Sequence, residues 1–107
     1  MRTTIVIGVG AFMLAGAAAA TDLRGRVDAR NNYAGTPFPV AGTAVSLYRE
    51  EGGQRRMVQS AYTAPNGIYY FSGVAPGRYT LQVERHSFHV EVGNARLQDL
   101  RPIVIAR

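Results

Sequence analysis

The two histidines are the side chains best suited to metal binding or acid–base catalysis, so their spacing decides whether they act together. His86 and His89 lie three residues apart. Side chains alternate between the faces of a strand, so positions three apart point in opposite directions. We therefore expect His86 at the end of a strand and His89 in solvent. No metal site is predicted at this pair.

The acidic and hydroxyl side chains show no spacing that is typical of a catalytic site. The sequence has no Asp-x-Asp-x-Asp calcium loop, no local pair of carboxylates for acid–base work, and no nucleophile elbow around a serine. It contains no cysteine, which excludes thiol chemistry, thiolate metal sites and disulfides. The sequence predicts a protein that is not an enzyme and that uses no cofactor.

Aromatic residues with one neighbouring arginine are the remaining candidates for function. Exposed tyrosines stack on sugar rings or anchor protein interfaces. The alternative is that strands accept tyrosine wherever it occurs. Two of these aromatics fall in a long loop and two on outward strand faces. The candidate binding residues are Tyr33, Phe38, Tyr48, Arg49 and Tyr70.

The first 20 residues are typical of a signal peptide for export. Arg2 gives a positive start, an apolar run covers 5–14, and Ala18 and Ala20 occupy the small-x-small positions before a cleavage point. We expect cleavage after Ala20, which leaves 21–107 as one periplasmic or secreted domain with no stable membrane anchor. An uncleaved anchor stays open as the alternative. The run is short and rich in Ala and Gly, however, for a span of ~20 strongly apolar residues.

The basic residues are all arginine, because the chain contains no lysine. Without Arg2, eleven arginines stand against seven acidic residues, so the domain carries a net charge of +4. A positive surface suits an anionic glycan or lipid head group, but these arginines are scattered along the chain, which favours an ordinary soluble surface. A nucleic-acid partner is not expected for an exported protein.

Alternation of apolar and polar residues with period two predicts seven short strands, and no long window shows a helical period. The expected strands are 23–28, 43–49, 56–63, 68–72, 78–84, 87–92 and 100–106. Pro102 cannot donate to a ladder, so the last strand should begin at an edge or carry a bulge. This pattern predicts an all-β fold, a single seven-stranded Ig-like or prealbumin-like β-sandwich.

The turn at Asn66-Gly67 predicts a hairpin between the third and fourth strands. Opposed residues share a face, so pairing of Thr63 with Ile68 fixes which side chains enter the core. The residues expected on the core face are Val58, Ser60, Tyr62, Tyr69 and Phe71, with Ala61 and Tyr70 on the other face. In the later strands, the residues expected inward are Tyr79, Leu81, Val83, Phe88, Val90 and Val92, with Thr80 and Gln82 outward.

Two segments resemble a known family. Residues 39–47, PVAGTAVSL, resemble the "P-V-x-G-A-x-V-x-L" entry of carboxypeptidase regulatory-like domains. Residues 63–83 resemble that family's core, "T-x-x-x-G-x-Y-x-F-x-x-L-x-P-G-x-Y-x-L-x-V", and Gly25 and Val27 fit its opening "G-x-V". The resemblance implies a transthyretin-like sandwich that serves as a binding or stabilising accessory module.

Two related groups with chemistry of their own do not fit this sequence. Transthyretin-like hydrolases close with Tyr-Arg-Gly-Ser, whereas 103–107 reads IVIAR. Self-crosslinking collagen-binding repeats need a lysine, which is missing here. We therefore expect a non-catalytic exported module that recognises a protein or carbohydrate partner in the cell envelope through its loops and one sheet face. The alternative is a structural subunit of an envelope or secretion assembly that pairs through an edge strand.

Overall fold

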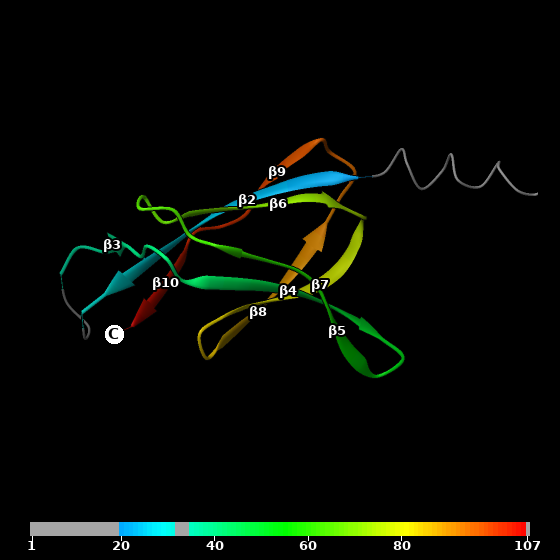
Figure 1. Cartoon of the computed structure of the whole chain (residues 1–107), viewed down its shortest axis with the longest axis horizontal. Coiled ribbons are helices and arrows are strands. Elements are labelled where there is room, and N and C mark those ends of the chain that lie inside the picture. Colours follow the sequence, from blue (N-terminus) through cyan, green and yellow to red (C-terminus); the bar gives the residue numbers. More distant parts are fainter. Residues whose placement is uncertain (1–19, 32–34, 107) are drawn as a thin grey trace, which may run out of the picture.

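The computed structural model describes residues 20–31 and 35–106, and these form two β-sheets packed face to face. The strands are β2 (Thr21–Arg30), β3 (Phe38–Pro39), β4 (Ala44–Glu51), β5 (Gln54–Tyr62), β6 (Ile68–Val74), β7 (Gly77–Val83), β8 (His86–Val92), β9 (Leu97–Asp99) and β10 (Ile103–Ala106). Figure 1 shows β2, β6 and β9 in the upper layer and β4, β5, β7 and β8 in the lower layer. The predicted all-β sandwich is confirmed.

The first sheet is organised around the long strand β2. Its first half pairs with β6 on one edge and with β9 on the other, and its second half pairs with β3 and β10. The pairs with β6 and β3 are antiparallel, and those with β9 and β10 are parallel. The predicted last strand, 100–106, is shorter than expected, because β10 covers only Ile103–Ala106. β9 ends before the predicted start, and Pro102 lies between the two strands. A residue without an N–H donor interrupts the ladder at this point.

The second sheet has the order β5-β4-β7-β8, and all of its pairs are antiparallel. Alternate residues of β4 and β7 face the first sheet, so the sequence period of two becomes one buried face per strand. The inward positions predicted for β7 are confirmed, since Tyr79, Leu81 and Val83 are all buried. The expected outward residue Thr80 is nevertheless buried at 6% exposure. Its cross-strand neighbours Tyr48 and His89 flank it on both sides.

The core lies between the two sheets and is made of aliphatic and aromatic side chains from both. Its largest fully buried members are Tyr69, Phe71, Leu23, Leu47, Leu81 and Ile105. The rings of Tyr69 and Phe71 pack edge to face, with centroids 5.6 Å apart. Burial of this apolar surface is the main stabilising contribution in a chain without cysteine.

Two glutamine side chains link the sheets at the two open sides of the sandwich. On one side, Gln59 of β5 donates to the Ser72 carbonyl at 3.0 Å and accepts from the Ser72 amide at 2.9 Å. On the other, Gln98 of β9 donates to the Glu91 carbonyl at 2.8 Å and accepts from the Gly93 amide at 3.0 Å. Each amide satisfies a backbone donor and a backbone acceptor, as a neighbouring strand would.

The predicted hairpin between the third and fourth strands is wrong, because β5 and β6 belong to different sheets. β5 pairs with β4, and β6 pairs with β2. The turn itself is present: Gly67 has φ +82°, and its amide donates to the Ala64 carbonyl at 2.8 Å. The Val27 amide donates to the Gly67 carbonyl at 2.9 Å, so the turn is held against β2. The chain therefore crosses between the sheets here.

The changed pairing moves three expected core residues to the surface. Tyr62 pairs with Ala44 and is 73% exposed, and Ser60, which pairs with Ser46, is exposed as well. Val58 lies in a bulge, where the register shifts between Leu47 and Tyr48, and has no partner in β4. Its side chain is 41% exposed. Pairing with β4 instead of β6 places Ala61 opposite the buried Val45, so that Ala61 instead packs against the core. Tyr69, Phe71 and the outward Tyr70 are placed as predicted.

Tyr69 is expected to make the fold less stable at alkaline pH. Burial raises the pKa of its hydroxyl to about 12, and this hydroxyl has no hydrogen-bond partner among the described residues. The folded pKa lies above the unfolded value of about 10, so stability present below pH 10 is lost as the pH rises towards 12. We expect a loss of about 2–3 kcal/mol over this window.

Urea unfolding of the wild type and of Tyr69→Phe at pH 8 and at pH 11.5 measures this loss. The variant should lack this part of the alkaline loss. At pH 8 it should be at least as stable as the wild type, since a buried hydroxyl without a partner costs about 1–3 kcal/mol. An identical loss in both proteins would contradict this assignment.

Candidate functional site

The outer face of the four-stranded sheet carries a stacked pair of side chains, Tyr48 and Arg55. The two residues come from neighbouring strands of the β4–β5 hairpin, whose turn is formed by Gly52 and Gly53. The guanidinium carbon of Arg55 lies 4.5 Å from the centroid of the Tyr48 ring. A planar guanidinium over an aromatic ring is held by cation–π attraction and keeps its N–H groups at the surface.

Polar and apolar side chains around this pair form one continuous surface. Arg55 donates to the Gln82 side chain at 3.2 Å, and the hydroxyls of Ser46 and Ser60 lie 3.3 Å apart. We call this surface the Tyr48 face and define it by residues that the strand register places on the outer side of the sheet: Ser46, Tyr48, Arg55, Met57, Ser60, Tyr62, Thr80, Gln82 and His89. Met57 is 52% exposed. The face offers apolar contact area beside hydrogen-bond donors and acceptors.

Arg49 follows Tyr48 in sequence but lies on the opposite face of β4. Its guanidinium stands 5.7 Å from the centroid of the buried Tyr79 ring, and its Nε lies 3.7 Å from a carboxylate oxygen of Glu51. Alternation along the strand separates Arg49 from Tyr48. The arginine beside the Tyr48 ring is therefore Arg55, which sequence reasoning missed.

Tyr70 lies on the outer face of the other sheet, opposite Arg24 of β2. Arg24 donates to both carboxylate oxygens of Asp99, at 2.6 and 3.0 Å. Hydrogen bonding from Arg24 holds the pKa of Asp99 below its ordinary value, and the same hydrogen bond raises the pKa of Arg24. Tyr70 thus belongs to a separate surface on the opposite side of the sandwich.

Phe38 does not lie on the Tyr48 face either. Phe38 is 39% exposed and pairs with Ala29 in the first sheet. Tyr33 lies outside the described residues. The structure therefore does not gather the predicted residues into one patch. The β4–β5 turn at Gly52-Gly53 was the signal in the sequence that could have placed Arg55 and Met57 beside Tyr48.

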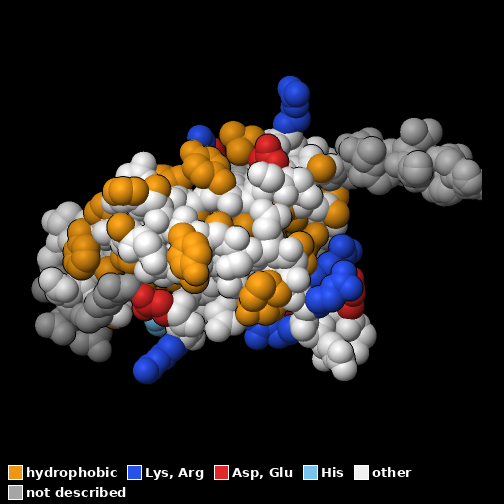
Figure 2. Space-filling model, viewed as in Figure 1, with side chains coloured by type: hydrophobic (Ala, Val, Ile, Leu, Met, Phe, Trp, Pro, Cys, Tyr) orange, Lys and Arg blue, Asp and Glu red, His pale blue; other side chains and the backbone are white. Residues whose placement is uncertain are grey.

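Charge and apolar area are distributed differently on the side of the molecule shown in Figure 2. Hydrophobic side chains form separate spots on this side, whereas several basic side chains lie close together near the β4–β5 hairpin with an acidic neighbour and others stand apart at the top and lower left. The histidines are both exposed, and His86 begins β8 as predicted. Within the described ranges, no group of three or more His, Asp or Glu side chains could hold a metal ion. No helix in these ranges is long and apolar enough to cross a membrane.

Solved structures of similar shape define the class of fold. The major plantain pollen allergen superposes with a TM-score of 0.60 at 13% identity, covering 82% of this chain and 94% of the allergen chain. The minor pilin of Streptococcus agalactiae gives 0.57 at 17% identity, covering 80% of this chain and 44% of the pilin. The basal pilin of Lactobacillus rhamnosus GG gives 0.56 at 13% identity, covering 71% and 34%. These identities show a shared β-sandwich fold.

The family is shown by the sequence itself. The model of the carboxypeptidase regulatory-like domain matches residues 22–102, which is most of the chain. The chain belongs to this family, as the two resembling segments predicted. No curated protein matches its sequence. This chain spans less than half the length of either pilin.

Proposed function

We propose that this chain is an exported, non-catalytic accessory module that binds a protein or carbohydrate partner of the cell envelope through the Tyr48 face. The observation that carries the proposal is the stack of Arg55 on Tyr48, with exposed apolar side chains of Met57 and Tyr62 on the same face. Tyrosine and arginine are enriched among residues that dominate binding energy. The Arg55 side chain is already fixed by Tyr48 and Gln82, so less conformational entropy is lost when a partner binds.

The recognition surface is tested by capture from envelope extract on the immobilised mature domain. Tyr48→Ser should weaken capture by at least about thirtyfold, the loss typical of an anchor residue worth 2 kcal/mol or more. Tyr70→Ser is the matched control, because Tyr70 is exposed on the opposite outer face. Unchanged capture by Tyr48→Ser, with thermal unfolding like that of the wild type, would remove the support for this surface.

The structural-subunit alternative has one observation in its favour. β5 and β8 form the two edges of the four-stranded sheet, and each pairs with one strand only among the described residues. Such an edge can accept a strand from another chain. A partner bound in this way would tolerate Tyr48→Ser but not a proline in the free edge of β8, for example His89→Pro.

Export with cleavage after Ala20 is a separate prediction. β2 begins at Thr21, directly after the expected cleavage point, and Thr21 is fully buried with its hydroxyl bonded to the Gly93 carbonyl at 2.8 Å. We expect mass spectrometry of the protein purified from its native envelope to find Thr21 at the N-terminus. An intact Met1 in that protein would contradict the prediction and would favour a retained anchor.

A further inference from the structure

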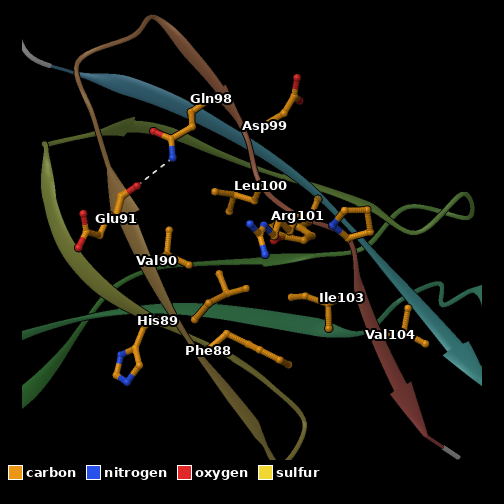
Figure 3. Close-up of a pocket in the computed structure, with 13 residues that line it drawn as sticks. Phe88, His89, Val90, Glu91, Gln98, Asp99, Leu100, Arg101, Ile103 and Val104 are labelled. Atoms are coloured by element: carbon orange, nitrogen blue, oxygen red, sulfur yellow. Dashed lines mark hydrogen bonds between the residues drawn. The ribbon is translucent and has the colours of Figure 1, made fainter.

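A cavity of about 460 Å³ opens at the side of the sandwich between β8 and the segment that joins β9 to β10. It lies on the side that Gln98 bridges, and Figure 3 shows the Gln98–Glu91 hydrogen bond at one end of it. The volume falls in the range of pockets that bind small molecules. β9 ends at Asp99 and β10 begins at Ile103, so among the described residues no paired strand covers this side of the core between them.

The walls of the cavity are mainly apolar. Figure 3 shows Phe88 and Val90 of β8 on one side, Leu100 and Ile103 on the other, and His89 directed away from the cavity. Phe88, Val90 and Leu100 are half-buried hydrophobic residues that pack against the core. An apolar chain or ring placed between them would remove exposed apolar surface from water.

One of the residues that line this cavity carries a buried hydroxyl without a partner. Tyr69 lines it, is 1% exposed, and has no acceptor for its hydroxyl among the described residues. The hydroxyl sits directly over Gly25, beside the point where the Leu100 amide donates to the Arg24 carbonyl at 2.8 Å. The unused donor therefore lies next to β2, close to the start of the β9–β10 connection.

The charged groups around the cavity leave one cation, on the β9–β10 connection, without an ion pair among the described residues. Asp99 is paired with Arg24, and Glu91 lies 3.8 Å from Arg78. Arg101 also lines the cavity and has no ion pair among the described residues. In Figure 3 its side chain projects from the β9–β10 connection towards β8. The free positive charge and the free hydroxyl donor suit an anionic oxygen.

We propose that this cavity binds a monomeric amphipathic anion, such as a medium-chain carboxylate. Its acidic group accepts hydrogen bonds from Arg101 and Tyr69, and its apolar chain lies between β8 and β10. A guanidinium–carboxylate contact is charge-assisted and is therefore stronger than a neutral hydrogen bond. The site is separate from the Tyr48 face, because Phe88 and Val90 project from the core side of β8.

Calorimetric titration of the mature domain with decanoate tests the proposal, and decanol serves as the uncharged control. We expect saturable one-to-one binding of decanoate and at least tenfold weaker binding of decanol. Arg101→Gln and Tyr69→Phe should each weaken decanoate binding, the former by about tenfold, and should weaken decanol binding by a smaller factor, since its hydroxyl accepts only a neutral-strength hydrogen bond. Arg56→Gln is the matched control, because Arg56 is an exposed arginine of β5 on the other open side.

A second variant tests the cavity itself. Val90→Phe adds volume between β8 and Leu100 and should abolish binding of both compounds, with circular dichroism and thermal unfolding confirming that it folds. If Val90→Phe does not fold, the Arg101→Gln comparison decides alone. The proposal is overturned if decanoate shows no saturable binding, or if it binds the wild type and Arg101→Gln equally. It is also overturned if the protein binds anionic vesicles but not free decanoate.

Discussion

Phe71→Ala is expected to lower the free energy of unfolding by about 3–5 kcal/mol, the cost typical of removing a buried aromatic ring. Phe71 is 1% exposed at the centre of β6, and its ring packs edge to face on Tyr69. Truncation removes both the buried area and this contact and leaves a cavity that the two sheets can only partly close. Such a loss is a large share of the 5–15 kcal/mol that stabilises most domains.

Urea or thermal unfolding measures the effect against Gln82→Ala. Gln82 faces outward and holds two long, exposed hydrogen bonds, from Arg55 at 3.2 Å and to the Glu84 carbonyl at 3.4 Å, so its loss should cost under about 1 kcal/mol. If Phe71→Ala does not fold, Phe71→Leu keeps the comparison possible, at a cost of about 1 kcal/mol. Equal destabilisation by the Phe71 and Gln82 variants would show that the assignment of inner and outer faces is wrong.

Gly25→Ala should cost about 3 kcal/mol, although it adds only one methyl group. A Cβ at Gly25 would lie 2.7 Å from Cε2 of Tyr69 and still closer to Cζ and the hydroxyl of that ring. The ring cannot move away, because Tyr69 is buried between the sheets against Phe71. The glycine is thus required by a close approach to an aromatic ring.

The matched control for this substitution is Gly93→Ala. A Cβ there would meet only the Gln98 side chain, at 3.9 Å, so little loss is expected. A double-mutant cycle adds a second test: in a Tyr69→Leu background, Gly25→Ala should cost at least about 1 kcal/mol less than it does alone. Additive costs would contradict contact between Gly25 and the Tyr69 ring.

The sandwich itself could be predicted because its determinants are local. Alternation along β7 placed Tyr79 and Leu81 in the core, and the structure confirms both. Pro102 marked an irregularity near the start of the last strand, and β10 begins only after it, at Ile103, because proline lacks the N–H donor that a ladder needs. These features need no knowledge of which strands are neighbours.

Strand pairing could not be predicted in the same way, since it depends on contacts between distant residues. An Asn-Gly turn is compatible both with a hairpin and with a crossing between sheets. The crossing between sheets is stabilised at Gly67, whose carbonyl accepts a hydrogen bond from the amide of Val27, 40 positions earlier in the chain. The error then moved Tyr62 from the surface to the core, because register decides every face along a strand.

The candidate site was predictable only in part, for a related reason. Tyr48 and Tyr70 were correctly placed as outward residues, but two outer faces exist, and the sequence does not say which residues share one. Arg55 joins Tyr48 through the β4–β5 pairing, whereas Arg49, its neighbour in sequence, turns to the other side. Residues that are adjacent in a strand point to opposite faces of the sheet, so neighbours in sequence do not share a surface.

Site-specific photo-crosslinking is the most direct test of the claim that the Tyr48 face is the recognition surface. A benzophenone amino acid is placed at Met57, which is 52% exposed on this face, or at Tyr70, which is 59% exposed on the opposite one. After irradiation in intact envelopes, we expect one discrete adduct from position 57 and none from position 70. Adducts only from position 70, or equally from both positions, would contradict the account.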